Sequence, residues 1–104
     1  MIAMRELPIP PDASDADQAI EVARGWIIDK KLQCSLFPSI WSETPEVWGI
    51  LLADFAAHIA DAIASDSNMS RQQIHGIIAK KLIDELQMPS AEHFGDFVDR
   101  EGEI

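Results

Sequence analysis

Apolar residues recur at helical spacing in three stretches of the chain, over about residues 14–30, 46–65 and 71–87. The last stretch is opened by Ser70, which forms a capping box with Gln73. The middle stretch has the strongest pattern, an apolar stripe on one face of a helix: Trp48, Leu51, Leu52, Phe55, Ile59 and Ile63. The pattern predicts three main helices with their apolar stripes turned inward.

Residues 32–37 instead alternate apolar and polar, which is typical of a half-buried β-strand. The inward face of this predicted strand carries Leu32, Cys34 and Leu36. The other extended segment is the amino-terminal arm, residues 1–11, which is broken by prolines and therefore suits only a sheet edge. The sequence thus predicts an α+β fold in which the three helices pack on a very small sheet made of one strand and the arm.

The backbone of the predicted strand needs more hydrogen-bond partners than a proline-rich arm supplies. We therefore expect a homodimer in which residues 32–37 pair with a second copy across a two-fold axis. Its interface would contain Cys34, Ser35, Phe37 and Trp41, with the two aromatic side chains on the strand face opposite Leu36. Cover by the first helix or by the arm of the same chain is an alternative for these aromatic residues.

Pro89 ends the third helical pattern, and an acidic segment follows it. The sequence therefore predicts one domain over residues 1–89 and an acidic tail over residues 90–104. We expect the tail to add little to the core, because it contains one short apolar cluster.

Charge narrows the classes of partner. The 104 residues contain 8 Lys and Arg against 18 Asp and Glu, a net charge of -10. Such a field repels phosphates, so we expect no nucleic-acid partner and favour a protein partner with a basic patch. The charged residues inside residues 47–64 argue against a membrane span, and Cys34 as the single cysteine indicates a reducing compartment, the cytoplasm.

Asp54, His58 and Asp61 are the best candidates for chemistry, since their spacing of four and three residues places them on one helix face. They suggest an enzyme or a metal-binding protein as the alternative function. A divalent ion would need further ligands, so we predict that the protein binds neither a metal nor a cofactor. The competing interpretation, the polar face of an amphipathic helix, is the one we adopt.

A resemblance to a known family is carried by four segments: Arg5-Glu6-Leu7-Pro8-Ile9-Pro10-Pro11, Leu32-Gln33-Cys34-Ser35-Leu36, Trp48-Gly49-Ile50-Leu51-Leu52-Ala53-Asp54 and Ala57-His58-Ile59-Ala60. Together they resemble a family of short uncharacterised bacterial proteins classed as a domain of unknown function. The resemblance covers about residues 4–86 and implies no activity or cofactor. The function expected from the residues is that of a small acidic, non-enzymatic interaction or structural protein that acts as a homo-oligomer.

Overall fold

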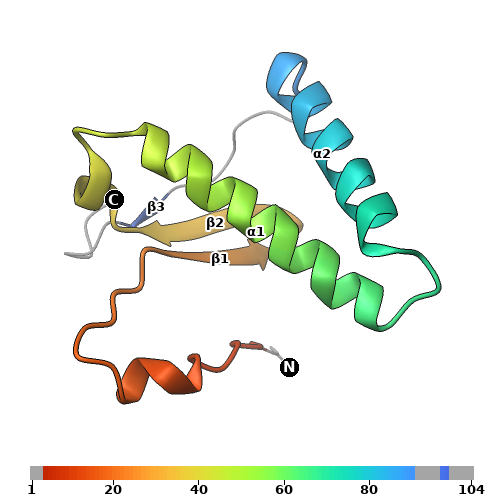
Figure 1. Ribbon diagram of the computed structural model, residues 1–104. Helices are drawn as coiled ribbons and strands as arrows, with labels where there is room; N and C mark the ends of the chain where they lie inside the picture. Colours follow the sequence, from red (N-terminus) through yellow and green to blue (C-terminus); the bar gives the residue numbers. More distant parts are fainter. Residues whose placement is uncertain (1–3, 91–96, 99–104) are drawn as a thin grey trace.

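The computed structural model of the protein describes residues 4–90 and 97–98. It is an α+β structure with a small sheet and, in the described part, two long helices (Figure 1). In chain order the elements are η1 (Pro11–Ser14), β1 (Ala23–Ile28), β2 (Lys31–Leu36), η2 (Pro38–Trp41), α1 (Glu46–Ser65), α2 (Arg71–Gln87) and β3 (Phe97–Val98), where η marks a 3-10 helix. The predicted fold class is confirmed at the level of α+β, and the prediction differs in the number of helices and in the make-up of the sheet.

The sheet is built on an antiparallel hairpin. The Cα partners of β1 and β2 are Ala23 and Leu36, Arg24 and Ser35, Gly25 and Cys34, Trp26 and Gln33, Ile27 and Leu32, and Ile28 and Lys31. The two turn residues, Asp29 and Lys30, both have positive φ, 51° and 70°. Positive φ at both central residues is what a type I′ turn requires, and this turn matches the twist of the strands it joins.

The predicted helix over residues 14–30 is wrong, because its second half forms β1. Three local features favour the strand. Gly25 costs a helix about 1 kcal/mol relative to alanine, whereas the β-branched Ile27 and Ile28 favour a strand. The helical spacing of Ala16, Ala19, Ile20 and Ala23 had no such support, and residues 15–22 have no regular structure.

The predicted strand over residues 32–37 is present as β2, but its partners are not those expected. β2 is the central strand, with β1 on one side and β3, running parallel to it, on the other. The arm, described from residue 4, forms no strand over residues 4–10. Both neighbours of β2 therefore come from its own chain, which corrects the expectation of a strand shared across a dimer. The boundary at residue 89 stays a prediction, although β3 belongs to the expected tail.

The two predicted helices α1 and α2 are present and pack on each other as a helical hairpin. The capping box of α2 forms as expected: the Gln73 amide donates to Ser70 Oγ (3.1 Å) and the Ser70 amide donates to Gln73 Oε1 (2.9 Å). The buried residues of the described part are Ala56 and Ala60 of α1 and Ile74 of α2. The small residues of α1 therefore make the intrachain contact.

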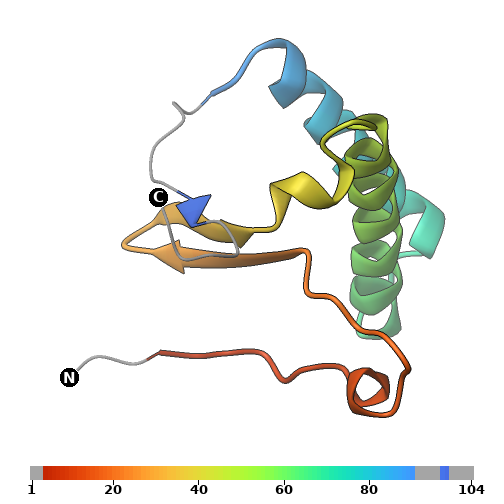
Figure 2. The same ribbon diagram turned by 90° about the vertical axis from the view of Figure 1, so that its left-hand side faces the viewer.

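The sheet does not lie on the helices as a second layer. The β1–β2 hairpin projects from the helix pair, with its turn pointing away from α1 (Figure 2). Extensive contacts join α1 with α2, β1 with β2 and β2 with β3, and in the described ranges no helix shares one with a strand. Among the described elements, the predicted extensive packing of helices on the sheet is thus not found.

Candidate functional site

The most unusual surface of the molecule is the large-residue face of α1. We define the α1 stripe as Leu52, Phe55, Ile59 and Ile63, which lie three or four residues apart and so share one face of the helix. Leu52 is 57% exposed, and the other three are each 47% exposed. The sequence pattern identified this face correctly as apolar, but the expected burial within the chain is wrong for these four residues, whereas Trp48 and Leu51 of the same predicted stripe are half-buried.

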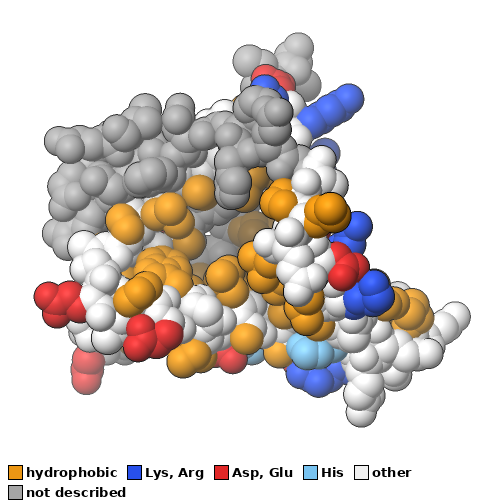
Figure 3. Space-filling view, turned by 90° about the horizontal axis from the view of Figure 1, so that it is seen from above, with side chains coloured by type: hydrophobic (Ala, Val, Ile, Leu, Met, Phe, Trp, Pro, Cys, Tyr) orange, Lys and Arg blue, Asp and Glu red, His pale blue; other side chains and the backbone are white. Residues whose placement is uncertain are grey.

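Further large apolar side chains are exposed on other parts of the described chain. α2 exposes Ile77, Leu82, Ile83 and Leu86, and the arm exposes Met4, Leu7 and Ile9. In the space-filling view from above, hydrophobic side chains gather around a hollow in the middle of the molecule (Figure 3). Monomeric proteins rarely expose large contiguous apolar patches, and such patches mark interaction sites.

The β1–β2 hairpin has one wholly apolar face. Since side chains alternate across a strand and paired residues share a face, the register places six residues on one side, which we call the hairpin face. It consists of Ala23, Gly25, Ile27, Leu32, Cys34 and Leu36. Ile27 is 73% exposed and Leu32 is 58% exposed. The opposite face is mixed, because it carries Arg24, Lys31, Gln33 and Ser35 beside Trp26 and Ile28.

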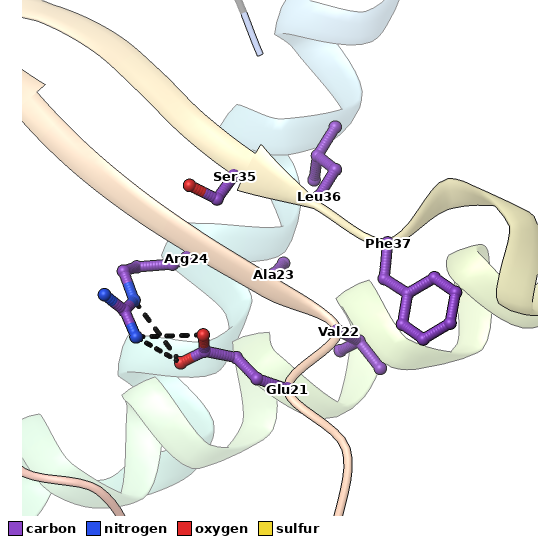
Figure 4. Close-up of a pocket in the computed structure, with 7 residues that line it drawn as sticks. All are labelled: Glu21, Val22, Ala23, Arg24, Ser35, Leu36 and Phe37. Atoms are coloured by element: carbon purple, nitrogen blue, oxygen red, sulfur yellow. Dashed lines mark hydrogen bonds and ion pairs between the residues drawn. The ribbon is translucent and has the colours of Figure 1, made fainter. Parts of the chain in front are cut away.

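A small pocket of about 310 Å³ lies at the open end of the hairpin (Figure 4). It is lined by Glu21, Val22, Ala23, Arg24, Ser35, Leu36 and Phe37. The Arg24 guanidinium is paired with the carboxylate of Glu21 (2.9 Å) and with that of Glu6 (3.2 Å), which ties the arm to β1. Because two carboxylates already neutralise this cation, the pocket is poorly suited to an anionic ligand.

The predicted interface residues lie in different environments. Cys34 is half-buried on the hairpin face, and Ser35 is exposed on the opposite face. The Phe37 amide donates to the Val22 carbonyl (3.0 Å) and extends the hairpin ladder by one pair. Trp41 is not on the strand at all: it belongs to η2 and makes an edge-to-face contact with Trp48 of α1, with centroids 5.2 Å apart. The expected shared strand face for the two aromatic residues is therefore wrong.

The candidate metal ligands do not converge. Asp54, His58 and Asp61 lie along the exposed polar face of α1. Asp61 accepts a hydrogen bond from Arg71 Nε (2.5 Å), an ion pair that joins the two helices. Within residues 4–90 and 97–98, no group of three or more His, Cys, Asp or Glu side chains could hold a metal ion. The geometry gives the alternative function no support.

One carboxyl group has a shifted pKa. Glu85, near the end of α2, accepts hydrogen bonds from the hydroxyl of Ser90 (2.5 Å) and from its amide (2.7 Å). These bonds, with a smaller contribution from the charge of Lys81, hold the pKa of Glu85 below its ordinary value. They fasten the chain that leaves α2.

Comparison with known proteins gives a family but no activity. The model of a family described as "Domain of unknown function (DUF5076)" matches residues 6–90. The chain belongs to this family. The resemblance inferred from the sequence is thereby confirmed for most of the domain.

A solved structure described as "putative pyruvate dehydrogenase", from the photosynthetic bacterium Rhodopseudomonas palustrus CGA009, is similar to this DUF5076 chain. The two share 31% sequence identity and a TM-score of 0.69, over 90% of this chain and 95% of the other. No curated protein matches the chain. The shared fold therefore extends over nearly the whole molecule.

In this DUF5076 chain, α1 is also long and apolar enough to cross a membrane by length and composition, with a mean hydropathy of 1.5. The core helix of a soluble protein passes the same test. The charged side chains of Asp54 and Asp61 are costly in a bilayer, where an uncompensated carboxylate at the centre of a helix is strongly disfavoured. The expectation of no membrane partner stays a prediction.

Proposed function

We propose that this DUF5076 chain is a non-enzymatic interaction protein that works as a homodimer in the cytoplasm, with the α1 stripe at the interface between two copies. The observation that carries the proposal is the distribution of apolar side chains. One large side chain, Ile74, is buried in the described part, whereas 18 large hydrophobic residues are exposed.

Within the described residues, full burial is confined to Ala56, Ala60 and Ile74, which is little for a chain of this length. Burying one isoleucine side chain contributes about 1.5–3 kcal/mol. Ordering the backbone costs about 1–2 kcal/mol for every residue. The sequence is 47% hydrophobic, which is ample for a core. The apolar residues that a core requires are therefore present, and a second apolar surface is needed to bury them.

The area of the chain indicates the size of that surface. Its solvent-accessible area is 9286 Å², whereas a compact monomer of 11.5 kDa has about 5,800 Å². Its radius of gyration is 15.8 Å, against about 13 Å for a compact chain of this length. Obligate homodimers bury about 2,000–5,000 Å² counted over both partners, or about 1,000–2,500 Å² per chain, so a dimer interface of this kind would account for a large part of the excess of about 3,500 Å².

A second copy explains the exposure better than a basic partner does. The α1 stripe carries no charge, so an apolar surface is its complement, and the chain itself presents such surfaces. A partner with a basic patch would instead match the acidic residues, which lie elsewhere on the surface. The expected basic partner is compatible with the dimer but is not needed to cover the stripe.

Nothing in the described residues favours the activity in the name of the similar structure. The described glycines, at positions 25, 49 and 76, do not form a glycine-rich phosphate loop. The described carboxylates and histidines do not gather into a site for a divalent ion. We therefore carry no dehydrogenase activity over to this chain.

The test compares Ile59→Asp with Ile50→Asp, measured by light scattering behind a sizing column. Ile59 is in the stripe and 47% exposed, while Ile50 is an isoleucine of α1 that is 61% exposed and lies four residues before Asp54, on the polar face. We expect wild type and Ile50→Asp to have twice the chain mass and Ile59→Asp to shift toward monomer. Circular dichroism separates dissociation from loss of the helices.

A monomeric wild type would contradict the proposal, and two further measurements would then assign the stripe. Flotation of that monomer with phosphatidylcholine vesicles would indicate a membrane surface. A dimer that forms only after truncation following Ser90 would indicate that residues 91–104 of the same chain cover the stripe.

A further inference from the structure

We infer that the α1 stripe of each copy packs on the hairpin face of the other, so that two identical helix-on-sheet contacts, related by a two-fold axis, complete the core. This inference rests on the proposed homodimer and specifies which surfaces meet. It is carried by two apolar surfaces whose largest members are exposed in the described chain: the α1 stripe, and the hairpin face, where Ile27 and Leu32 are exposed while Ala23, Cys34 and Leu36 are half-buried.

In the described chain, no helix packs extensively on the hairpin face and no strand packs extensively on the α1 stripe. The helix hairpin packs through the small-residue edge of α1, which leaves the stripe beside it exposed. The β1–β2 hairpin projects from the helices with its turn pointing away from α1, and no extensive helix–strand contact forms in the described part (Figure 2). A projecting hairpin is within reach of a second molecule.

The proposed contact is reciprocal, because each copy offers both surfaces to the other. Pairing α1 with α1 of a second copy would bury the stripes but would leave both hairpin faces in water. Packing the stripe on the hairpin face buries both surfaces of both copies at once. A two-fold axis repeats that contact, because a residue that touches another across such an axis is touched in the same way in return. It also restores the helix-on-sheet layering that an α+β fold requires.

The two surfaces are compatible in size. From Leu52 to Ile63 the stripe spans about 17 Å along the helix at 1.5 Å per residue. The hairpin face, from Ala23 to Ile27 on β1, spans about 13 Å at 3.3 Å per residue. The stripe is therefore long enough to cover the whole length of the hairpin face.

The hairpin face has a low centre at Gly25. A Cβ atom built there would meet only Leu32 Cδ1, at 3.5 Å, an ordinary contact, so the chain itself leaves room for a side chain at this position. A glycine inside a strand often marks a place where another segment approaches closely. Between Ile27 and Leu36, Gly25 and Cys34 form a low centre that accepts a ridge of large helix residues.

The experiment uses Cys34, the single cysteine, as a built-in probe of the hairpin face. The variant Ile59→Cys adds a thiol to the stripe, and mild oxidation of a mixture of isotope-labelled and unlabelled chains is followed by peptide mapping. We expect disulfides between position 34 of one chain and position 59 of the other, and a covalent dimer on a non-reducing gel. The matched control, Ile50→Cys, adds its thiol to the polar face and should give no such link.

Disulfides between other pairs of positions would overturn the inference but would still agree with a dimer. A disulfide between two position-59 thiols in the Cys34→Ser, Ile59→Cys background would show that the stripes meet each other. A disulfide between two Cys34 thiols in wild type would show that the hairpin faces meet. A dimer by light scattering with no link from 34 to 59 would overturn it as well, whereas a monomeric wild type would also remove the proposed function.

A second variant tests the fit without new thiols. Gly25→Val fills the low centre with a side chain that favours strands, so the hairpin should persist by circular dichroism. We expect dimer dissociation to become at least tenfold easier. An unchanged dissociation constant would contradict the close approach of a helix at Gly25.

Discussion

The two apolar edges of α1 behave in opposite ways. Along one edge, Ala56 and Ala60 are buried, Ala60 with no exposed surface, and α2 is the described element that shares extensive contacts with α1. Along the adjacent edge, the much larger side chains of the α1 stripe remain about half exposed. A chain that is stable as a monomer would be expected to bury its large apolar residues first, because the free energy gained by burial grows with apolar area. This difference is the basis of our proposal that the small residues assemble the monomer and the large ones assemble a dimer.

The largest effect within the chain is expected from the contact that α2 makes. Ile74→Ala removes the one large side chain buried between the helices and should lower the free energy of unfolding by about 2–5 kcal/mol. Ile77→Ala is the matched control, since Ile77 lies one turn along α2 and is exposed. Urea unfolding followed by circular dichroism measures both. Equal losses of unfolding free energy in the two variants would show that the buried and exposed faces of α2 do not differ in their contribution to stability.

Salt should change the affinity of the two copies for each other, because each copy carries a net charge of -10. An apolar contact between two acidic chains is opposed by their repulsion, which salt screens within about 10 Å at 0.1 M. We expect the dimer to tighten several-fold between low and high salt, measured by sedimentation. A dimer that weakens with salt would indicate that ion pairs, and not the stripe, hold it together.

The hairpin turn offers a smaller, stabilising change. Lys30 sits at φ 70°, a conformation that glycine adopts without steric cost. Lys30→Gly should therefore raise the free energy of unfolding by about 0.5–1 kcal/mol. Lys31→Gly, one residue on and inside β2, is the control and should destabilise. Thermal unfolding compares the two, and a destabilising Lys30→Gly would argue against the type I′ turn.

The smallest effect is expected at the end of α2. Ser90→Ala removes the hydroxyl that lowers the pKa of Glu85, so this pKa should rise toward its ordinary value, and Ser90→Thr should restore it. A lowered carboxyl pKa adds stability above the ordinary pKa, and this stability is lost as the pH falls through the lowered value. Carboxyl NMR titration measures the shift. An unchanged pKa would show that the hydrogen bond from the Ser90 hydroxyl is not formed.

The sequence predicts the elements whose signals are local. The capping box at Ser70 and the apolar period of α1 identified both helices, and strict alternation identified β2. The strand β1 was missed because Ala16 to Ile27 happen to fit a helical period. Gly25, the pair Ile27 and Ile28, and the turn after them were the signals that could have revealed it.

The candidate site was predicted only in part, for a physical reason. Periodicity shows which face of α1 is apolar, and Leu52, Phe55, Ile59 and Ile63 were all assigned to that face. It does not show what covers the face, because the same pattern serves a core and an interface equally. The role of the stripe became visible only when the small residues were found to occupy the intrachain contact.

Sedimentation equilibrium of the wild-type protein over a wide range of concentration tests the central claim most directly. The account predicts a species of twice the 11.5 kDa chain mass that persists at micromolar concentration and dissociates in Ile59→Asp but not in Ile50→Asp. A folded wild-type chain that stays at the monomer mass throughout would contradict it.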